Sequence, residues 1–157
     1  MTDVEIAPVA SADKAQLWPA LQDYIAEMTA YVDVPRVDGA YEYPAFDSYW
    51  TDESRWPFWA LKDGARAGFA LLRRDADGTM VMAEFTVLPR FRRSGAGLSF
   101  ARQLLARFPA TWILSEFAAN TGAVAFWRRA IAGYPYTERS YLGGMGKLRI
   151  EQRVVVS

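Results

Sequence analysis

The sequence has 157 residues, of which 52% are apolar and 15% are aromatic, which is enough for one well-buried core. We expect residues 1–157 to form a single domain. The 18 lysines and arginines balance the 18 aspartates and glutamates, so charge gives no argument for binding nucleic acid or an anionic membrane. Because cysteine and histidine are absent, the sequence excludes disulfides, cysteine nucleophiles, Ser-His-Asp hydrolysis and zinc sites built on imidazole or thiolate.

The N-terminal segment, MTDVEIAPVASADKA, has no basic region followed by an apolar run. The sequence also has no stretch of roughly 18 apolar residues that could span a bilayer. We therefore expect a soluble, cytoplasmic protein.

A strand and a helix are predicted at the start of the chain. Val4 to Pro8 alternates in polarity as a short strand does, and Ser11 or Asp13 could cap the helix that follows. Pro19 removes a backbone hydrogen bond and crowds the preceding turn, so we expect two helical pieces that meet near Trp18. The apolar stripe of this helix consists of Leu17, Leu21, Tyr24, Ile25 and Met28.

A hairpin is predicted in the middle of the chain. Pro57 to Lys62 and Arg66 to Arg73 flank an Asp63-Gly64 turn, which is a strong hairpin signal. Residues 75–78 make a second turn into a third antiparallel strand. The preceding residues 31–56 have no clear period and are rich in aromatic and acidic side chains.

The stretch from Met80 to Phe108 is predicted to be strand, glycine loop and helix. Pro89 ends the strand, and residues 90–97 form a basic loop that contains two glycines. The strand alternates between two faces, with Val81, Ala83, Phe85 and Val87 on one and Met82, Glu84 and Thr86 on the other. The helix is indicated by apolar residues at helical spacing, namely Leu98, Ala101, Leu104, Leu105 and Phe108.

The loop has the features of an anion site. The first backbone N–H groups of a helix lack intrahelical partners and point, with the positive end of the helix dipole, at whatever lies before them. Gly95 and Gly97 allow positive φ and a close approach of the backbone, and Arg90, Arg92 and Arg93 supply positive charge. A ligand that carries pyrophosphate therefore fits better than a neutral one. The alternative is a tight turn with solvated arginines.

The rest of the chain predicts a strand, a helix and a terminal hairpin. Thr111 to Phe117 is strongly apolar, and Thr121 to Ile131 has helical character. Tyr134 to Leu142 and Lys147 to Val155 would pair through a glycine-rich turn.

Two motifs resemble the signatures of the GCN5-related N-acetyltransferases (GNAT). Arg92, Gly95 and Gly97 match the spacing of the family's Arg/Gln-x-x-Gly-x-Gly/Ala loop. Asn120 and the Phe126-Trp127 pair resemble the family's second signature, an asparagine before a helix that carries a small residue and Phe-Tyr. The resemblance covers roughly residues 58 to 141. It implies an α/β (α+β) fold with a mixed, mostly antiparallel central sheet, flanking helices and a splayed central strand pair.

The resemblance also implies acetyl-CoA as the acetyl donor. The loop would hold its pyrophosphate, and the backbone at the end of the central strand would pair with the pantetheine arm. The residues that this implies for the cofactor are Val87, Leu88, Arg92, Arg93, Ser94, Gly95, Ala96, Gly97, Asn120 and Trp127. By itself, Asn120 is also typical of a helix N-cap.

The general acid departs from the family pattern. Many members carry tyrosine where this sequence has Trp127, and an indole N–H is a donor but not a useful acid. Either a nearby tyrosine, with Tyr134 the first choice before Tyr136 and Tyr141, protonates the leaving thiolate, or water does. The alternative for each of these tyrosines is a purely structural role.

Glu84 is the candidate general base, because it is the only acid on the predicted central strand. It points either into the cleft or against a helix as a structural carboxylate. The catalytic glutamate of the best-known histone-type members aligns with Val81 rather than with Glu84. Glu116 on the adjoining strand is a weaker candidate.

The resemblance predicts transfer of an acetyl group by direct attack of a primary amine, from a small molecule or a peptide. No covalent intermediate and no metal are needed. The acidic, aromatic segment 31–56 would form a wall of the acceptor site suited to a cationic amine, or else a surface loop whose aromatics complete the core. The terminal hairpin could form the interface of a homodimer.

Two other functions are open. A non-catalytic acyl-CoA-binding or regulatory module would keep the loop without the acid, as Trp127 permits. A dinucleotide-binding domain is a weaker fit, because its fingerprint needs a glycine where Phe100 stands.

Overall fold

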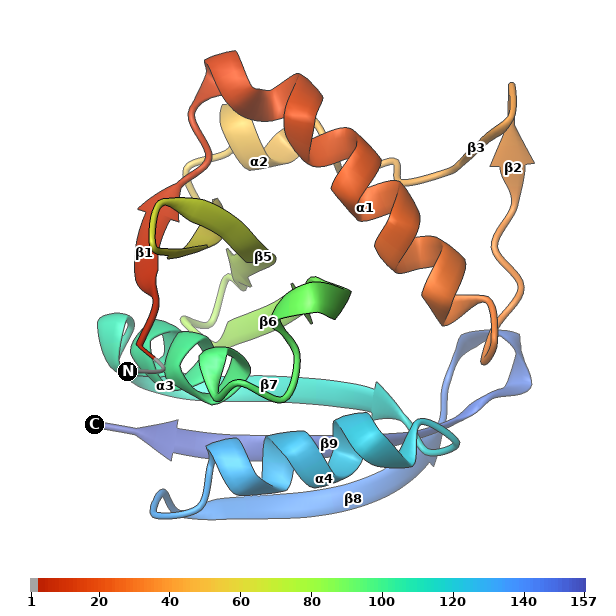
Figure 1. Ribbon diagram of the computed structural model, residues 1–157. Coiled ribbons are helices and arrows are strands. Elements are labelled where there is room, and N and C mark those ends of the chain that lie inside the picture. Colours follow the sequence, from red (N-terminus) through yellow and green to blue (C-terminus); the bar gives the residue numbers. More distant parts are fainter. Residues whose placement is uncertain (1–2) are drawn as a thin grey trace.

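The computed structural model describes residues 3–157 and shows a mixed sheet flanked by helices (Figure 1). The strands of the main sheet are, in chain order, β1 (Glu5–Pro8), β4 (Arg55–Lys62), β5 (Ala65–Arg74), β6 (Met80–Val87), β7 (Ala110–Phe117), β8 (Tyr136–Leu142) and β9 (Leu148–Val156). Their spatial order is β1-β4-β5-β6-β7-β9-β8. Within residues 3–157, β6 and β7 are parallel and the other neighbours in this sheet are antiparallel. The predicted mixed, mostly antiparallel sheet is confirmed.

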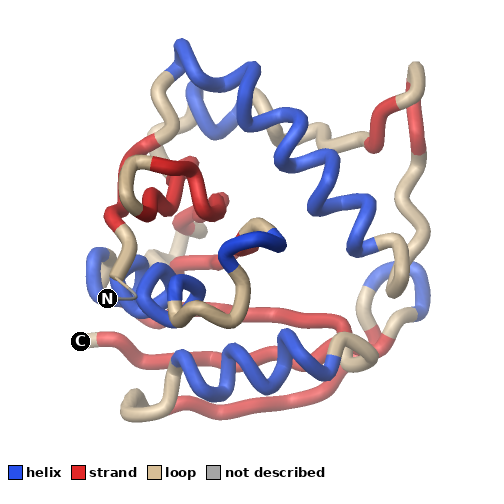
Figure 2. The backbone as a smooth tube through the Cα atoms, in the orientation of Figure 1, coloured by secondary structure: helices blue, strands red, loops and turns tan. Residues whose placement is uncertain are grey.

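Helices cover both faces of this sheet (Figure 2). They are α1 (Lys14–Met28), α2 (Ser48–Thr51), α3 (Ala96–Arg107) and α4 (Thr121–Ala130). Alternate residues of β5 show the two faces: Phe69 and Leu71 pack with α1 and α2, whereas Ala70 and Leu72 pack with α3 and α4. In the described part of the chain, no helix is long and apolar enough to cross a membrane.

The two central strands diverge after a short paired section. β6 and β7 pair at Met80 with Trp112 and at Val81 with Ile113, and no further pairing between them occurs among residues 3–157. The second halves of both strands therefore line an opening in the middle of the sheet. This confirms the predicted splayed central strand pair.

A β-bulge in β6 changes which side chains share a face. Leu71 of β5 lies opposite Glu84, and Leu72 lies opposite Met82, which leaves Ala83 as an extra residue on β6. Met82 and Phe85 consequently pack with the same core, whereas Ala83 packs toward α1. The predicted alternation, with Ala83 and Phe85 on one face, is wrong. The extra residue at the bulge reverses the side-chain order in the second half of the strand.

Helix α1 is continuous, which corrects the prediction of two pieces that meet near Trp18. Pro19 lies inside it, in the second turn, and one missing backbone hydrogen bond does not end the helix. Burial of the stripe residues Leu17, Leu21 and Ile25 offsets the free energy lost with this hydrogen bond. Asp13, at the N-cap position, makes no capping hydrogen bond and instead pairs with Arg66 at 3.5 Å.

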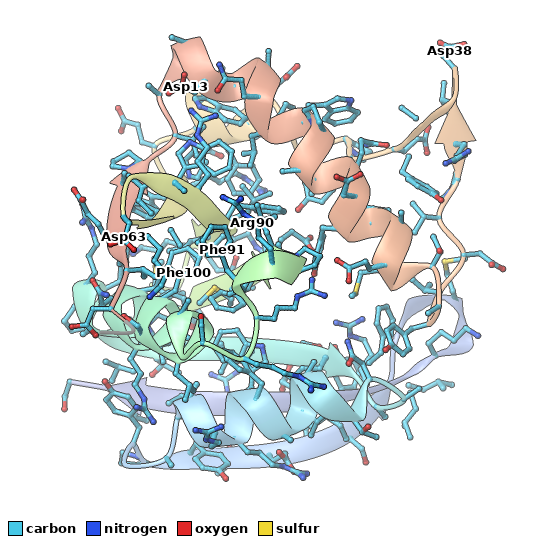
Figure 3. The ribbon with its side chains drawn as sticks, in the orientation of Figure 1. Asp13, Asp38, Asp63, Arg90, Phe91 and Phe100 are labelled. Atoms are coloured by element: carbon cyan, nitrogen blue, oxygen red, sulfur yellow. The ribbon has the colours of Figure 1, made fainter. Side chains whose placement is uncertain are left out.

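The predicted hairpins are present, with small differences at their ends. β4 and β5 turn at Asp63 and Gly64, which both have positive φ (Figure 3). β4 begins at Arg55, and β8 at Tyr136, each within two residues of the prediction. The segment 31–56, which has no sequence period, contains α2, a small hairpin of β2 (Arg36–Val37) and β3 (Ala40–Tyr41), and the first two residues of β4.

Candidate active site

A continuous groove runs through the opening between β6 and β7. It consists of two adjoining cavities of about 830 and 340 Å³. We call the larger one, beside Arg93, Gly95 and Gly97, the loop cavity, and the smaller one, beside Glu84 and Glu116, the carboxylate cavity. Both are lined by Tyr24, Met28, Phe85, Asn120, Ala123 and Trp127, so the two cavities adjoin along these residues.

The first turn of α3 forms the wall of the loop cavity. Gly95 is the N-cap of α3 and has φ 82°, a left-handed conformation that favours glycine. Gly97 is needed for another reason, because a Cβ there would lie 3.1 Å from Phe126 and 3.3 Å from Val87. Its φ is not positive, so the predicted left-handed conformation holds at Gly95 and not at Gly97. The backbone at Gly97 and Leu98 can thus approach a ligand closely.

The arginines of the loop have different roles. The Nε of Arg92 donates to the Val87 carbonyl at 2.7 Å, and its two terminal nitrogens each bond Glu27 of α1 at 2.9 Å. Arg90 lies over its neighbour Phe91, 4.5 Å from the ring centroid, and lines neither cavity (Figure 3). Arg92 and Arg93 both line the loop cavity. Because Arg92 is already paired with Glu27, Arg93 is the predicted cation in this cavity without an ion-pair partner among the described residues.

Ser94 and Ala96 complete the loop. The Ser94 hydroxyl donates to the Phe91 carbonyl at 2.6 Å and lies 3.4 Å from the Ala96 nitrogen. These bonds shape the turn that leads into α3. Ala96 is fully buried, so its side chain contributes to the core and not to the cavity.

The end of β6 has one backbone group directed at the groove. The Leu88 N–H donates to the Ala67 carbonyl of β5 at 2.8 Å, so the trans peptide directs the Val87 carbonyl to the opposite side of β6, toward the opening. That carbonyl accepts from Arg92 and keeps a second lone pair. Val87 lines the loop cavity, whereas Leu88 does not.

Asn120 and Trp127 lie where the two cavities meet. The Asn120 side chain caps α4 by accepting from the Ala123 N–H at 3.2 Å, as its sequence context predicted. Trp127 is 6% exposed and packs edge-on against Phe85, with ring centroids 4.9 Å apart. Phe126, the other residue of the Phe-Trp pair, also lines the loop cavity.

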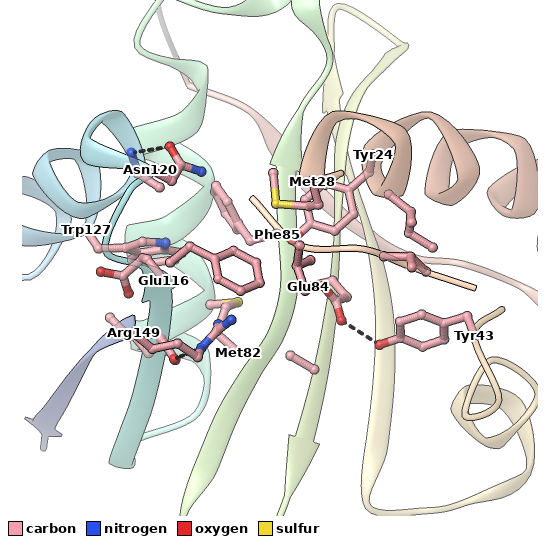
Figure 4. A pocket seen from close by; sticks show the side chains of 18 of the residues that line it. Tyr24, Met28, Tyr43, Met82, Glu84, Phe85, Glu116, Asn120, Trp127 and Arg149 are labelled. Carbon is pink, nitrogen blue, oxygen red and sulfur yellow. Dashed lines mark hydrogen bonds between the residues drawn. The ribbon is translucent and has the colours of Figure 1, made fainter. Parts of the chain in front are cut away.

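Glu84 projects into the carboxylate cavity from the bulged part of β6 (Figure 4). Its carboxylate accepts a hydrogen bond from the Tyr43 hydroxyl at 2.8 Å. Burial raises the pKa of Glu84, and hydrogen bonding from Tyr43 and Tyr24 offsets part of this rise. Burial beside Glu84 also raises the pKa of both tyrosines, so they remain neutral donors.

Glu116, on β7, lies at the other side of the carboxylate cavity (Figure 4). One carboxylate oxygen accepts from Gln152 at 2.9 Å, and the other is buried without a partner among the described residues. Burial raises the pKa of Glu116 to about 7. Gln152 also bonds Glu138 at 3.0 Å, which ties Glu116 to the surface pair of Glu138 and Arg128.

Arg149 reaches the carboxylate cavity from β9, on the side opposite Glu84 (Figure 4). Its Nε donates to Ser115 at 2.8 Å, and its guanidinium lies 4.2 Å from the ring centroid of Phe117. It forms no ion pair with any carboxylate in residues 3–157. The cavity thus has the Glu84 carboxylate on one wall, and Arg149 together with the Glu116 carboxyl group on the other.

The sequence model of the acetyltransferase (GNAT) family matches residues 18–134. The chain belongs to this family. As a GNAT member it is classed as an N-acetyltransferase, in agreement with the resemblance carried by the loop and the Asn120 helix. A search of curated protein sequences found no match.

Solved structures share the GNAT fold with this chain. A ribosomal-protein-alanine N-acetyltransferase from Escherichia coli is 19% identical with a TM-score of 0.62, covering 98% of this chain and 94% of that one. The ribosomal-protein-alanine N-acetyltransferase of Brucella melitensis is 16% identical with a TM-score of 0.69, covering 97% and 99%. Spermidine N-acetyltransferase of Vibrio cholerae, solved with CoA and spermine, is 12% identical with a TM-score of 0.68, covering 99% and 97%.

The GNAT groove does not include the predicted acid. Tyr134 packs beside the core after α4 and lines neither cavity. Tyr141 bonds Ser115 at 3.1 Å, and Tyr136 is 41% exposed. The tyrosines at the groove are instead Tyr24 of α1, Tyr31 and Tyr43.

Sequence reasoning missed several residues of the groove, among them Tyr24, Arg129 and Arg149. Tyr24 was assigned to the apolar stripe of α1, whereas Tyr43 belongs to the segment 31–56 that was predicted either as a wall of the acceptor site or as a surface loop. That segment has both predicted roles, because Glu42 and Tyr43 line the carboxylate cavity while Phe46 packs between Trp18 and Trp50, 4.9 Å from each ring centroid.

Proposed function

We propose that the protein is an acetyl-CoA-dependent N-acetyltransferase that moves the acetyl group to a primary amine by direct attack. The observation that carries this proposal is the single groove, which joins the first turn of α3 at one end to the Glu84 carboxylate at the other. An anionic donor and a cationic acceptor would meet where Asn120 and Trp127 lie.

The loop cavity fits the donor. The first-turn N–H groups of α3 would take the pyrophosphate, with Arg93 and Arg129 as the cations that line the same cavity. Gly97 keeps this cradle open, because its Cβ would fill the space beside Val87 and Phe126. The free lone pair of the Val87 carbonyl and the side chain of Asn120 would hold the pantetheine arm.

The carboxylate cavity supplies the proton acceptor. An ammonium beside Glu84 gives up one proton, and the raised pKa of this carboxyl makes its ionised form a stronger base for accepting that proton. The amine nitrogen then forms a bond to the thioester carbonyl carbon while the carbon–sulfur bond breaks. Tyr43 fixes the Glu84 carboxylate during this step.

The leaving thiolate takes its proton from water. Trp127 stands where many GNAT members have tyrosine, and Tyr134 lies outside the groove. The Trp127 indole makes no hydrogen bond with any described residue, so its N–H can donate to the sulfur. An N–H donor stabilises developing negative charge without transferring a proton.

The acceptors named for the structural neighbours support the proposal that this chain acetylates an amine. The enzyme from Vibrio cholerae is a spermidine N-acetyltransferase, and those from Escherichia coli and Brucella melitensis act on ribosomal-protein alanine. All of these acceptors present an amine. We extend this acceptor class to the present chain on the basis of Glu84 and Tyr43.

The donor site is tested by calorimetric titration with acetyl-CoA, with NAD as a negative control. We expect micromolar affinity for acetyl-CoA, and Arg93→Glu should weaken it about tenfold or more, because a charge-assisted contact becomes repulsive. Arg90→Glu is the matched control, since Arg90 lines neither cavity. A folded protein that does not bind acetyl-CoA would refute the proposal.

The replacement of the family's tyrosine by Trp127 also favours a second candidate, a non-catalytic acyl-CoA-binding module. Such a protein would bind acetyl-CoA with the same dependence on Arg93. It would release no thiol with any amine, so turnover separates the two functions.

A further inference from the structure

Arg149 is a cation in a cavity whose other charged residues are acids. Glu42, Glu84 and Glu116 line the same cavity, yet none of them forms an ion pair with it. Its positive charge acts on the cavity nevertheless, because it lowers the pKa of Glu84, Glu116 and Tyr24 against the opposing effect of burial. A half-buried guanidinium without a carboxylate partner is costly unless a ligand supplies one.

The side chain of Arg149 is held in place from several sides. Ser115 accepts from its Nε, and the Tyr141 hydroxyl lies 3.1 Å from the same serine oxygen. Phe117 lies under the guanidinium, and Gly143 leaves room for the stem, since a Cβ there would be 2.7 Å from the Arg149 Cδ. These contacts order the side chain before any ligand binds, which reduces the entropy lost on binding.

These contacts leave the two terminal nitrogens of the Arg149 guanidinium free. Nε is used by Ser115, whereas the two terminal nitrogens make no hydrogen bond with any residue that the structure describes. A planar pair of N–H donors matches the two oxygens of a carboxylate. Across the cavity, Glu84 and Tyr43 provide the complementary negative site (Figure 4).

We propose that the acceptor is a small amino acid, with its carboxylate on Arg149 and its ammonium on Glu84. This rests on the proposed function of the groove. A cavity of about 340 Å³ is at the small end of the range for ligand sites, which suits a single amino acid better than an extended polyamine. Two opposite charges on facing walls select a zwitterion and disfavour a ligand with positive charges only.

The reaction on such an acceptor is balanced in atoms and protons. The ammonium gives one proton to Glu84, and the neutral nitrogen forms a bond to the carbonyl carbon of the thioester. The carbon–sulfur bond breaks, and the second proton of the nitrogen reaches the sulfur through water. The products are an N-acetylamino acid and the free thiol. The product nitrogen is uncharged and no longer attracts Glu84, so the product binds through Arg149 alone.

The test compares each amino acid with its carboxamide as acceptor, using the full chain, acetyl-CoA and thiol release. The two compounds share the amine and the side chain and differ in the carboxylate. For the preferred amino acid we expect kcat/KM to exceed that of its carboxamide roughly 30-fold or more, because the carboxamide leaves Arg149 unpaired. Spermidine serves as an acceptor without a carboxylate.

Arg149→Gln should remove this preference, mainly by raising KM for the amino acid, and Arg149→Lys should restore part of it. Arg153→Gln is the matched control, because Arg153 is exposed on the same strand and outside the cavity. Unchanged affinity for acetyl-CoA shows that each variant is folded. The comparison of amino acid with carboxamide needs no variant, so it decides the question even if Arg149→Gln does not fold.

The outcomes separate this inference from the proposed function. Thiol release with spermidine or with carboxamides as efficient as with amino acids would overturn the amino acid acceptor and leave the acetyltransferase intact. An amino acid preference that survives Arg149→Gln would overturn the role of Arg149. Acetyl-CoA binding without thiol release from any acceptor would overturn the inference and favour the binding module, and absence of binding would refute both proposals.

Discussion

The two ends of the groove are built in different ways. The loop cavity depends on backbone: the first turn of α3, the left-handed Gly95 and the carbonyl at the end of β6. The carboxylate cavity depends on side chains from separate elements, with Glu84 on β6, Tyr43 before α2 and Arg149 on β9. A site built from backbone groups can bind the same donor in every member of a family, because it does not depend on particular side chains. A site built from side chains can change its specificity from one protein to the next by substitution. The donor end should therefore be common to the family, and the acceptor end particular to this chain.

Removing the proposed general base, Glu84, should have the largest effect of the changes considered. It should lower turnover without changing the donor end of the groove. We expect Glu84→Gln to lower kcat at least about 100-fold, because the ammonium loses its proton acceptor. Affinity for acetyl-CoA should stay unchanged, since Glu84 does not line the loop cavity. Thiol release and calorimetry on the same sample measure both quantities. Equal losses in turnover and in acetyl-CoA affinity would show that the two ends are not separable.

The backbone end should be sensitive to added volume. A Cβ at Gly68 would lie 2.3 Å from the Thr86 carbonyl oxygen, beneath the part of β6 that lines the loop cavity. We expect Gly68→Ala to lower the free energy of unfolding by roughly 2–4 kcal/mol, because the strands must separate to make room. Gly144→Ala is the control, since no atom lies within 4 Å of its Cβ position. Urea unfolding of both variants checks this, and similar losses would contradict it.

The side-chain end should show a pH effect on stability through Glu116. Its pKa is about 7 in the folded protein against an ordinary value of 4.5, so the folded state holds the extra proton between these two values. The contribution of Glu116 to stability is therefore full below about pH 4.5 and declines as the pH rises toward 7.

We expect the unfolding free energy of the wild type, relative to Glu116→Gln, to fall by on the order of 1–2 kcal/mol from pH 5 to pH 8. Thermal or urea unfolding of both proteins at several pH values measures this difference. A difference that stays constant with pH would mean that Glu116 ionises at its ordinary pKa, and that its burial on β7 does not affect this pKa.

The sequence predicted the backbone end well because its signals are local. Period-2 and helical spacing located β6 and α3, the glycine spacing indicated the loop, and Asn120 caps α4 as its position before a helix suggested. In each case the residues that define the feature are neighbours in the chain. Periodicity and turn chemistry therefore carry the information.

The other end could not be predicted because it depends on registers and packing between distant segments. The extra residue Ala83 exists only relative to β5, and it decides which way Glu84 points. In the sequence, nothing distinguishes Arg149 from Arg153 on the same predicted strand. Only the pairing of β9 with β7 places Arg149 beside Ser115 and the cavity. Pro19 misled the helix prediction for the same reason, since tertiary burial of α1 overrides the local cost.

The most direct test of the central claim is an NMR titration of ¹⁵N-labelled protein with acetyl-CoA. The claim is that one groove joins the donor loop to the reaction centre, and Trp127 reports on their junction through its indole N–H. We expect the amide signals of Gly95 and Gly97 and the indole signal of Trp127 to shift together, at one affinity, while Gly64 and Gly78 in distant turns stay unchanged. Shifts confined to other residues, or a Trp127 signal that does not respond while the loop does, would contradict the account.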